Sequence, residues 1–182
     1  MPQVLLLGDL HIPQRVVDVP TRFKELLAAG HFQQVLCTGN LCSKEAADWV
    51  KSLSADVHIV KGPFDSDQSI SESQVITVAG WRFGLVNGYQ MVPIGDQHAW
   101  ADMAKSLDCE ILVTGYSHLS AVLTSEGKYC LNPGSASGAY NLLSSQVTPS
   151  FMVLEVDSAQ VAVYVYHLVE DKVEVVTATL TK

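Results

Sequence analysis

Two side chains that could bind a divalent metal ion, Asp9 and His11, directly follow a short apolar segment near the start of the chain. Residues 4–7 have the pattern of a buried parallel strand, and Gly8 ends the run. Open α/β sheets place their chemistry at the carboxyl ends of strands, where a carboxylate and an imidazole two residues apart both reach one ion. The alternative is an ordinary polar turn after a strand, because Asp-x-His is a short and common spacing.

Other apolar, strand-like segments also end in glycine-containing loops that carry side chains able to act in a site. These loops lie at residues 39–40, 62–65, 87–88 and 115–118. If two sheets present their strand ends at one edge of the molecule, the loops converge. The repetition therefore favours a shared site over a single polar turn.

The elements that must position this site alternate regularly in residues 1–60, where short apolar segments are separated by helical patterns. This order is typical of parallel β–α–β units. In the first helical pattern Phe23, Leu26 and Leu27 are expected to face the core, and Ser43 is expected to cap the second helix. The expected elements are strands at 4–7, 34–38 and 56–60 and helices at 20–30 and 43–53.

The pattern changes after a polar loop at residues 66–73. The expected elements are a hairpin at 75–86, a helix at 96–107, a buried strand at 110–113, and strands at 121–124, 128–131, 151–156, 161–168 and 173–180. Residues 132–135 have the composition of a turn. We therefore expect an α/β/β/α sandwich of two mixed sheets flanked by helices, in a single domain spanning residues 1–182.

Composition excludes several classes of function. The 182 residues are 48% hydrophobic and 16% charged, with a net charge of −8. This acidic balance argues against nucleic-acid binding, and there is no apolar segment of the roughly 20 residues that a membrane span needs. The four cysteines form no C-x-x-C pair, which argues against a zinc ribbon and a disulfide framework. We expect a soluble, cytoplasmic protein without direct membrane insertion.

The order of the loops resembles the calcineurin-like metallophosphoesterase superfamily over nearly the whole chain. The pattern of that superfamily is Asp-x-His, Gly-Asp, Gly-Asn-His, a histidine beside glycine, and Gly-His-x-His. In active members these loops hold two metal ions, which activate a water molecule and clamp a phosphoryl group. The resemblance implies the superfamily's sandwich fold, and it assigns metal-ligand positions residue by residue.

Three of the seven ligand positions implied by the resemblance keep their usual residue type, namely Asp9, His11 and His118. Asn40 stands where a carboxylate usually bridges the two metals, so it offers an oxygen without a charge. The charge that the protein supplies is thereby reduced to that of Asp9. This set implies a weakly held Zn²⁺ or Mn²⁺ at most, and no tightly bound cofactor.

The other positions depart from the superfamily pattern. Asn87 and Tyr116 replace histidine ligands, and Pro63 has no side-chain ligand atom. Phe64 stands where a histidine usually protonates the leaving group, so general-acid catalysis has no candidate there. The resemblance therefore predicts no tight binuclear centre and little or no hydrolysis.

Longer stretches resemble one subfamily, the small phosphoesterase-fold subunits of the retromer sorting complex. The matching stretches are residues 8–13, 36–42, 56–60, 132–141 and 164–166. This resemblance implies a non-enzymatic scaffold in endosomal cargo retrieval, cytoplasmic and peripheral on endosomal membranes through the complex. The alternative is a weak metal-dependent phosphodiesterase that uses the residues kept at the metal positions.

The same resemblance implies two partner surfaces. The degenerate metal face would pack against the C-terminal end of the large α-solenoid subunit of retromer, through Pro63, Phe64 and Tyr116. A separate apolar patch would recruit regulators, including a Rab GTPase-activating protein. The residues expected in that patch are Val92, Val153, Tyr164 and Tyr166. Without the resemblance, the two tyrosines would be interpreted as ordinary sheet packing.

Overall fold

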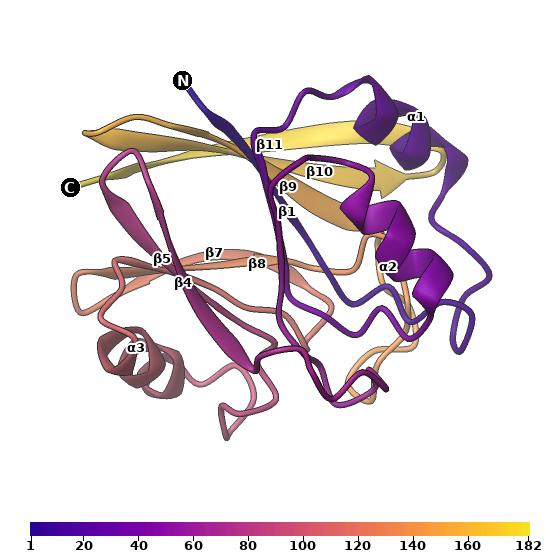
Figure 1. Cartoon of the computed structure of the whole chain (residues 1–182), viewed down its shortest axis with the longest axis horizontal. Coiled ribbons are helices and arrows are strands. Elements are labelled where there is room, and N and C mark those ends of the chain that lie inside the picture. The colour runs from indigo at the N-terminus through magenta and orange to yellow at the C-terminus, as the bar shows by residue number, and fades with distance from the viewer.

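The chain folds into two β-sheets packed face to face, as a computed structural model of residues 1–182 shows (Figure 1). One sheet has the strand order β11-β10-β9-β1-β2-β3, and the other has the order β4-β5-β6-β8-β7. The strands are β1 (Gln3–Leu7), β2 (Gln34–Cys37), β3 (Val57–Ile59), β4 (Ser73–Val78), β5 (Trp81–Val86), β6 (Ile111–Val113), β7 (Ser120–Ser125), β8 (Lys128–Pro133), β9 (Ser150–Val156), β10 (Gln160–Val169) and β11 (Lys172–Thr181). The helices are α1 (Thr21–Ala29), α2 (Lys44–Lys51) and α3 (Gln97–Ser106).

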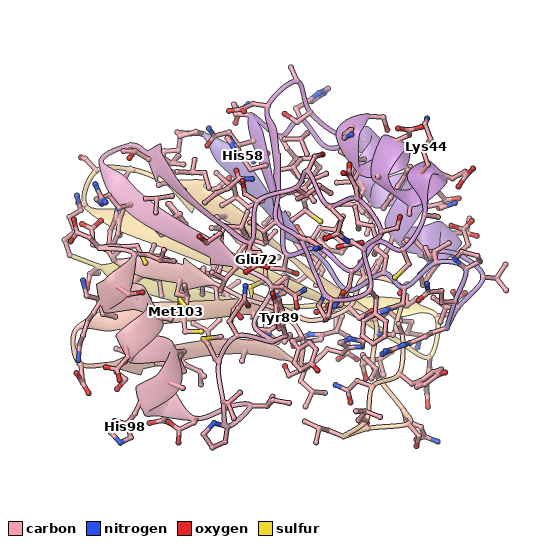
Figure 2. The ribbon with its side chains drawn as sticks, turned by 60° about the horizontal axis from the view of Figure 1, so that its bottom comes forward. Lys44, His58, Glu72, Tyr89, His98 and Met103 are labelled. Atoms are coloured by element: carbon pink, nitrogen blue, oxygen red, sulfur yellow. The ribbon has the colours of Figure 1, made fainter.

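Both sheets are mixed. Strands β1, β2 and β3 are parallel, whereas β9, β10 and β11 form an antiparallel meander that joins them through β1. In the second sheet β5, β6 and β8 are parallel, and β4 and β7 are antiparallel edges. Helices α1 and α2 pack on the first sheet and α3 on the second; Figure 2 shows Lys44 of α2 and Met103 of α3 on opposite sides of the sandwich. The expected α/β/β/α architecture is confirmed.

The core has three layers because each sheet is covered on both faces. Leu6 and Phe83 meet in the cluster between the sheets. Leu5 and Phe23 belong to the cluster under α1 and α2, and Trp100 to the cluster under α3. The continuous apolar run of β1 follows from this arrangement, since its alternate side chains face two different apolar layers. No helix is both long enough and apolar enough to cross a membrane.

Several local expectations need correction. Leu26 does not face the core but is 41% exposed, because Phe23 and Leu27, one helical turn apart, form the buried face of α1. Helix α2 ends at Lys51, two residues before the expected end. Residues 132–135 are not simply a turn, since β8 continues to Pro133.

Candidate functional site

The site forms where loops after β1, β2 and β6 meet around Asp9. This carboxylate is fully buried. Its Oδ1 accepts a hydrogen bond from Asn40 Nδ2 at 3.0 Å, and its Oδ2 accepts one from the Tyr116 N–H at 2.7 Å. Gly115 is needed here because a Cβ at that position would lie 2.5 Å from Asp9 Oδ2. The loops after three strands are therefore fixed around one acidic group.

His11 and His118 complete a group that we call the kept ligand group, together with Asp9. The Nε2 atoms of His11 and His118 lie 4.0 and 3.8 Å from Asp9 Oδ1, and the ligand atoms of all three residues lie within 4.8 Å of one another. His118 Nδ1 lies 2.6 Å from the Ala139 carbonyl, which directs Nε2 toward Asp9. His11 Nδ1 faces Cys42 Sγ at 3.5 Å.

The kept ligand group fits one divalent metal ion. His11 Nε2 is buried without a hydrogen-bond partner, which is the state expected of a ligand atom. Burial and the nearby Arg15 lower the pKa of His11 to about 3, so its ring is neutral and able to coordinate. Burial raises the pKa of Asp9, and His118 opposes this shift. A cation at this position would favour the charged carboxylate.

The loops that hold these side chains adopt strained backbone conformations. Asp9, His11, Asn40, Tyr116 and His118 all have positive φ, between 47° and 71°. Non-glycine residues rarely adopt this conformation, and it costs about 1–3 kcal/mol at each position. Residues that persist in it must be held by their surroundings.

Asp65 holds the loop after β2. Its two carboxylate oxygens accept hydrogen bonds from the backbone N–H groups of Asn40, Leu41, Cys42 and Gly62, at 2.7 to 3.1 Å. Sequence analysis placed Asp65 in a strand-end loop but gave it no role. Its position after Gly-Pro-Phe could not reveal that it organises a loop more than twenty residues away.

Two buried serines hold the loop after β1. Ser135 Oγ donates to the Asp9 carbonyl and Ser137 Oγ to the Leu10 carbonyl, each at 2.7 Å. Ser135 is the last residue of the stretch at 132–135 that was expected to be a turn, and Ser137 lies two residues beyond it. The two serines instead support the kept ligand group, because their hydroxyls satisfy carbonyls in that buried loop.

The remaining predicted site residues form what we call the altered face, namely Pro63, Phe64, Asn87 and Tyr116. Phe64 is 44% exposed, and its ring meets the His11 ring edge-on at a centroid distance of 5.2 Å. Asn87 is buried, and its Nδ2 donates to the Thr38 carbonyl at 2.7 Å, so it ties the end of β5 to the end of β2. Its Oδ1 has no hydrogen-bond partner.

The loop that follows Asn87 is fixed to the segment before β4. Gln90 Nε2 donates to the Glu72 carbonyl at 3.2 Å. Tyr89 lies beside Glu72 in Figure 2, and burial together with the Glu72 carboxylate raises the pKa of Tyr89. This loop also carries Ile94, which is 44% exposed next to the site.

A cavity of about 200 Å³ opens between the kept ligand group and the altered face. Arg15 lines it, with its guanidinium 4.7 Å from the Phe64 ring centre and 5.4 Å from that of Tyr140. Leu142 and Leu143 form another part of the rim and are 99% and 66% exposed. Sequence analysis missed these three rim residues, because only the folded chain brings residues 15 and 140–143 together.

The second predicted surface is only partly assembled. Val153 and Tyr164 are paired neighbours on β9 and β10, and they pack in one cluster with Tyr166, whose ring stacks on Phe151 at 4.7 Å. Val92 is 78% exposed in the loop between β5 and α3, outside that cluster. Three of the four residues therefore share one apolar cluster, in which Val153 is buried, and Val92 does not belong to it.

Comparison with known proteins places this fold and site in a family. The calcineurin-like phosphoesterase superfamily domain matches residues 3–159. The chain is 34% identical over 176 residues to vacuolar protein sorting-associated protein 29 (Vps29) of Schizosaccharomyces pombe, covering 94% of each protein. The chain therefore belongs to the calcineurin-like phosphoesterase superfamily and, within it, to the Vps29 family.

Solved structures agree with this placement. Vps29 of Cryptosporidium parvum is 37% identical, with a TM-score of 0.95 over 100% of this chain and 98% of that one. Wild-type Vps29 of Entamoeba histolytica, solved in complex with Zn²⁺, is 42% identical, with a TM-score of 0.92 over 97% of this chain and 98% of that one.

Proposed function

We propose that this protein is a non-enzymatic scaffold subunit of retromer, and that the altered face binds the C-terminal end of the large α-solenoid subunit. The observation that carries the proposal is Phe64, a half-exposed aromatic side chain at the mouth of the site. The resemblance to the superfamily aligns Phe64 with the histidine that donates a proton in its active members. An exposed ring next to Pro63 suits burial against a partner protein better than it suits phosphate chemistry.

The rim around Phe64 supports a protein partner. Ile94, Leu142 and Leu143 are all exposed and line the same cavity as Phe64. Clustered exposed apolar side chains usually mark an interaction surface, because their solvation is unfavourable in the isolated protein. Arg15, held between two aromatic rings, adds the residue type that is often found with aromatic anchors in interfaces.

The altered face also argues against efficient hydrolysis. Pro63 offers no ligand atom, and Asn87 offers only a neutral amide oxygen where the superfamily pattern has a histidine nitrogen. Only the kept ligand group is arranged around a metal position. A single metal supplies Lewis-acid chemistry but lacks the second ion that clamps the other oxygen of an in-line displacement. Within the chain, His11, His118 and Asp9 would hold the ion, and the Asp9 carboxylate would also balance part of its charge.

We also propose that Val153, Tyr164 and Tyr166 recruit regulators, such as a Rab GTPase-activating protein, to the complex on endosomal membranes. Tyr164 and Tyr166 are half-buried on the six-stranded sheet, and Val153, which is 9% exposed, packs with them in one apolar cluster. Val92 lies apart from them, in the loop between β5 and α3 that also carries Ile94. It is therefore better tested together with the altered face.

Binding to the C-terminal part of a retromer solenoid subunit tests the main proposal. Phe64→Asp should weaken the affinity measured by titration calorimetry at least tenfold, because it places a charge in the centre of the proposed interface. Val75→Asp is the matched control, since Val75 is 42% exposed but lies on β4 outside the cavity rim. Equal affinities for wild type and Phe64→Asp would exclude the altered face, and no binding by wild type would exclude the partner.

A weak metal-dependent phosphodiesterase is the second candidate, and the kept ligand group favours it. Its three ligand atoms converge on one position, and one of them is a buried, unpartnered nitrogen. Hydrolysis of an activated diester in excess metal, described at the end of the Discussion, separates the two functions.

A further inference from the structure

Strand β11 is a long sheet edge without the usual protection. Ten consecutive residues pair with β10 in an uninterrupted register, so no bulge bends the edge away. No proline and no charged residue occurs between Glu174 and Lys182. Natural proteins normally protect such edges with charges, prolines or bulges, because the free backbone groups pair readily with another strand. At the other side of the sandwich, Gln74 bridges to β3 through the Ile59 carbonyl at 2.8 Å.

The backbone groups that face outward from β11 can be identified. The Thr181 carbonyl accepts from the Tyr129 hydroxyl at 2.8 Å, and the Thr181 N–H donates to that hydroxyl at 3.3 Å, so both groups of Thr181 point away from β10. The Lys182 N–H instead donates inward, to the Ala159 carbonyl. In an antiparallel strand these directions alternate. The outward-facing residues that remain are therefore Val173, Val175, Thr177 and Thr179.

An apolar cleft of about 230 Å³ lies beside this edge, between β11 and β7 of the other sheet. Val122, Val165 and Val176 line it, and Val176 is 58% exposed. Two of the residues that line it contact each other, with the Ser120 hydroxyl 2.7 Å from His167 Nε2. The open edge thus combines free backbone groups with an apolar side-chain site.

We propose that a second copy of this chain pairs antiparallel with β11, about a two-fold axis through Val176. In this register Val173 pairs with Thr179 of the second copy and Val175 with its Thr177, so every outward-facing residue identified above is used. Each of the four residues on each copy donates once, which gives about eight inter-chain hydrogen bonds. Val176 meets its own copy at the axis. The interface is isologous and closes as a dimer.

Other registers are poorer. Moving the axis to Thr177 brings Val173 opposite Thr181, whose groups are already bonded to Tyr129, and places Lys172 opposite Lys182. Moving it to Val175 brings Thr179 opposite Asp171, which lies in the turn before β11. The register centred on Val176 instead brings the acidic turn at Glu170 toward Lys182 of the other copy.

Cysteine cross-linking under mild oxidation tests this register. Val176→Cys should give a disulfide-linked dimer, because residues at the centre of a non-hydrogen-bonded pair have Cα atoms about 4.5 Å apart. Thr179→Cys is the matched control on the same strand. Its two copies would lie six residues apart along the ladder, about 20 Å, and should not cross-link. Wild type reports any background from the four native cysteines.

Sedimentation velocity of the whole protein, from micromolar to submillimolar concentration, measures the association itself. Wild type should show a concentration-dependent dimer, and Val176→Lys should remain monomeric because it opposes two like charges at the axis. Thr177→Pro, which removes an outward N–H that the monomer does not use, should also abolish the dimer. A wild-type protein that stays monomeric throughout, or equal cross-linking at positions 176 and 179, would overturn the proposal.

Discussion

The kept ligand group and the altered face both contribute side chains to one cavity but differ in burial and polarity. Asp9 and His11 are completely buried and fixed by hydrogen bonds or neighbouring polar atoms. Pro63 and Phe64 are exposed and apolar. The loops themselves have the same strained geometry in both groups, as the positive φ of His118 and Tyr116 shows. The difference indicates that loops of the same backbone geometry carry side chains of contrasting burial and polarity, and under our proposal these side chains separate metal coordination from partner docking.

Metal affinity should depend on the kept ligand group only. Asp9→Ala removes the charged ligand and should lower Zn²⁺ affinity more than 100-fold, since the loss of supporting groups alone typically costs about 10–100-fold. Tyr116→Phe, on the altered face, should leave the affinity nearly unchanged because the backbone N–H to Asp9 remains. Titration calorimetry measures both. Equal losses in the two variants would show that the two groups act together.

Restoring ligands to the altered face should create a second metal position. In the triple variant Pro63→Asn, Asn87→His and Tyr116→His, each changed position regains a coordinating side chain of the type that the superfamily pattern has there. The zinc stoichiometry, measured by titration calorimetry in excess Zn²⁺, should rise from one ion per chain to two. A variant that still binds one ion would mean that the loops no longer position a second site.

The serine support beneath the kept ligand group should contribute measurably to stability. Ser135→Ala leaves the Asp9 carbonyl and the Ala139 N–H without their partner in a buried site. We expect a loss of about 1–3 kcal/mol in the free energy of unfolding in urea. Ser145→Ala, at an exposed position, should change it by less than about 0.5 kcal/mol. An equally small change in the free energy of unfolding for Ser135→Ala would contradict the role of Ser135 in holding the loop after β1.

A further effect is expected on the pH dependence of stability. The pKa of His11 is lowered from 6.5 to about 3. Between these pH values the unfolded chain therefore binds a proton at His11 that the folded chain does not bind. The free energy of unfolding should therefore fall as pH drops from 6.5 toward 3, by at most about 1.4 kcal/mol per pH unit. Asp9 acts with the opposite sign, because its raised pKa makes stability fall as pH rises above 3.8.

His11→Gln isolates the histidine contribution in urea titrations over that pH range. The variant should lose less stability on acidification than wild type does. His31→Gln, at an exposed position away from the site, is the control. Parallel pH profiles for wild type and His11→Gln would contradict the pKa assigned to His11.

Much of the framework could be predicted from local patterns. Periodicity located every strand and helix, and Ser43 caps α2 as expected, by accepting from the Ala46 N–H. The strand ends identified the kept ligand group, because parallel strands place their carboxyl ends at one edge of a sheet. Errors such as the exposure of Leu26 arose where a short helix buries only a narrow face.

The remaining features depend on contacts between distant parts of the chain. Ser135 bonds a carbonyl 126 residues away, and Asp65 organises a loop 24 residues away. Arg15 and Leu142 become rim residues only when their loops meet. Serine, aspartate and leucine in loops carry no local signal of such roles, because each is common on any surface.

The most direct test is hydrolysis of an activated aryl phosphodiester by the purified protein in excess Mn²⁺ or Zn²⁺. Asp9→Ala serves as the background, because it removes the charged ligand. A scaffold whose altered face lacks a second metal position and a general acid should show no turnover above this variant. Metal-dependent turnover in wild type that disappears in Asp9→Ala would show an active centre and contradict the non-enzymatic assignment.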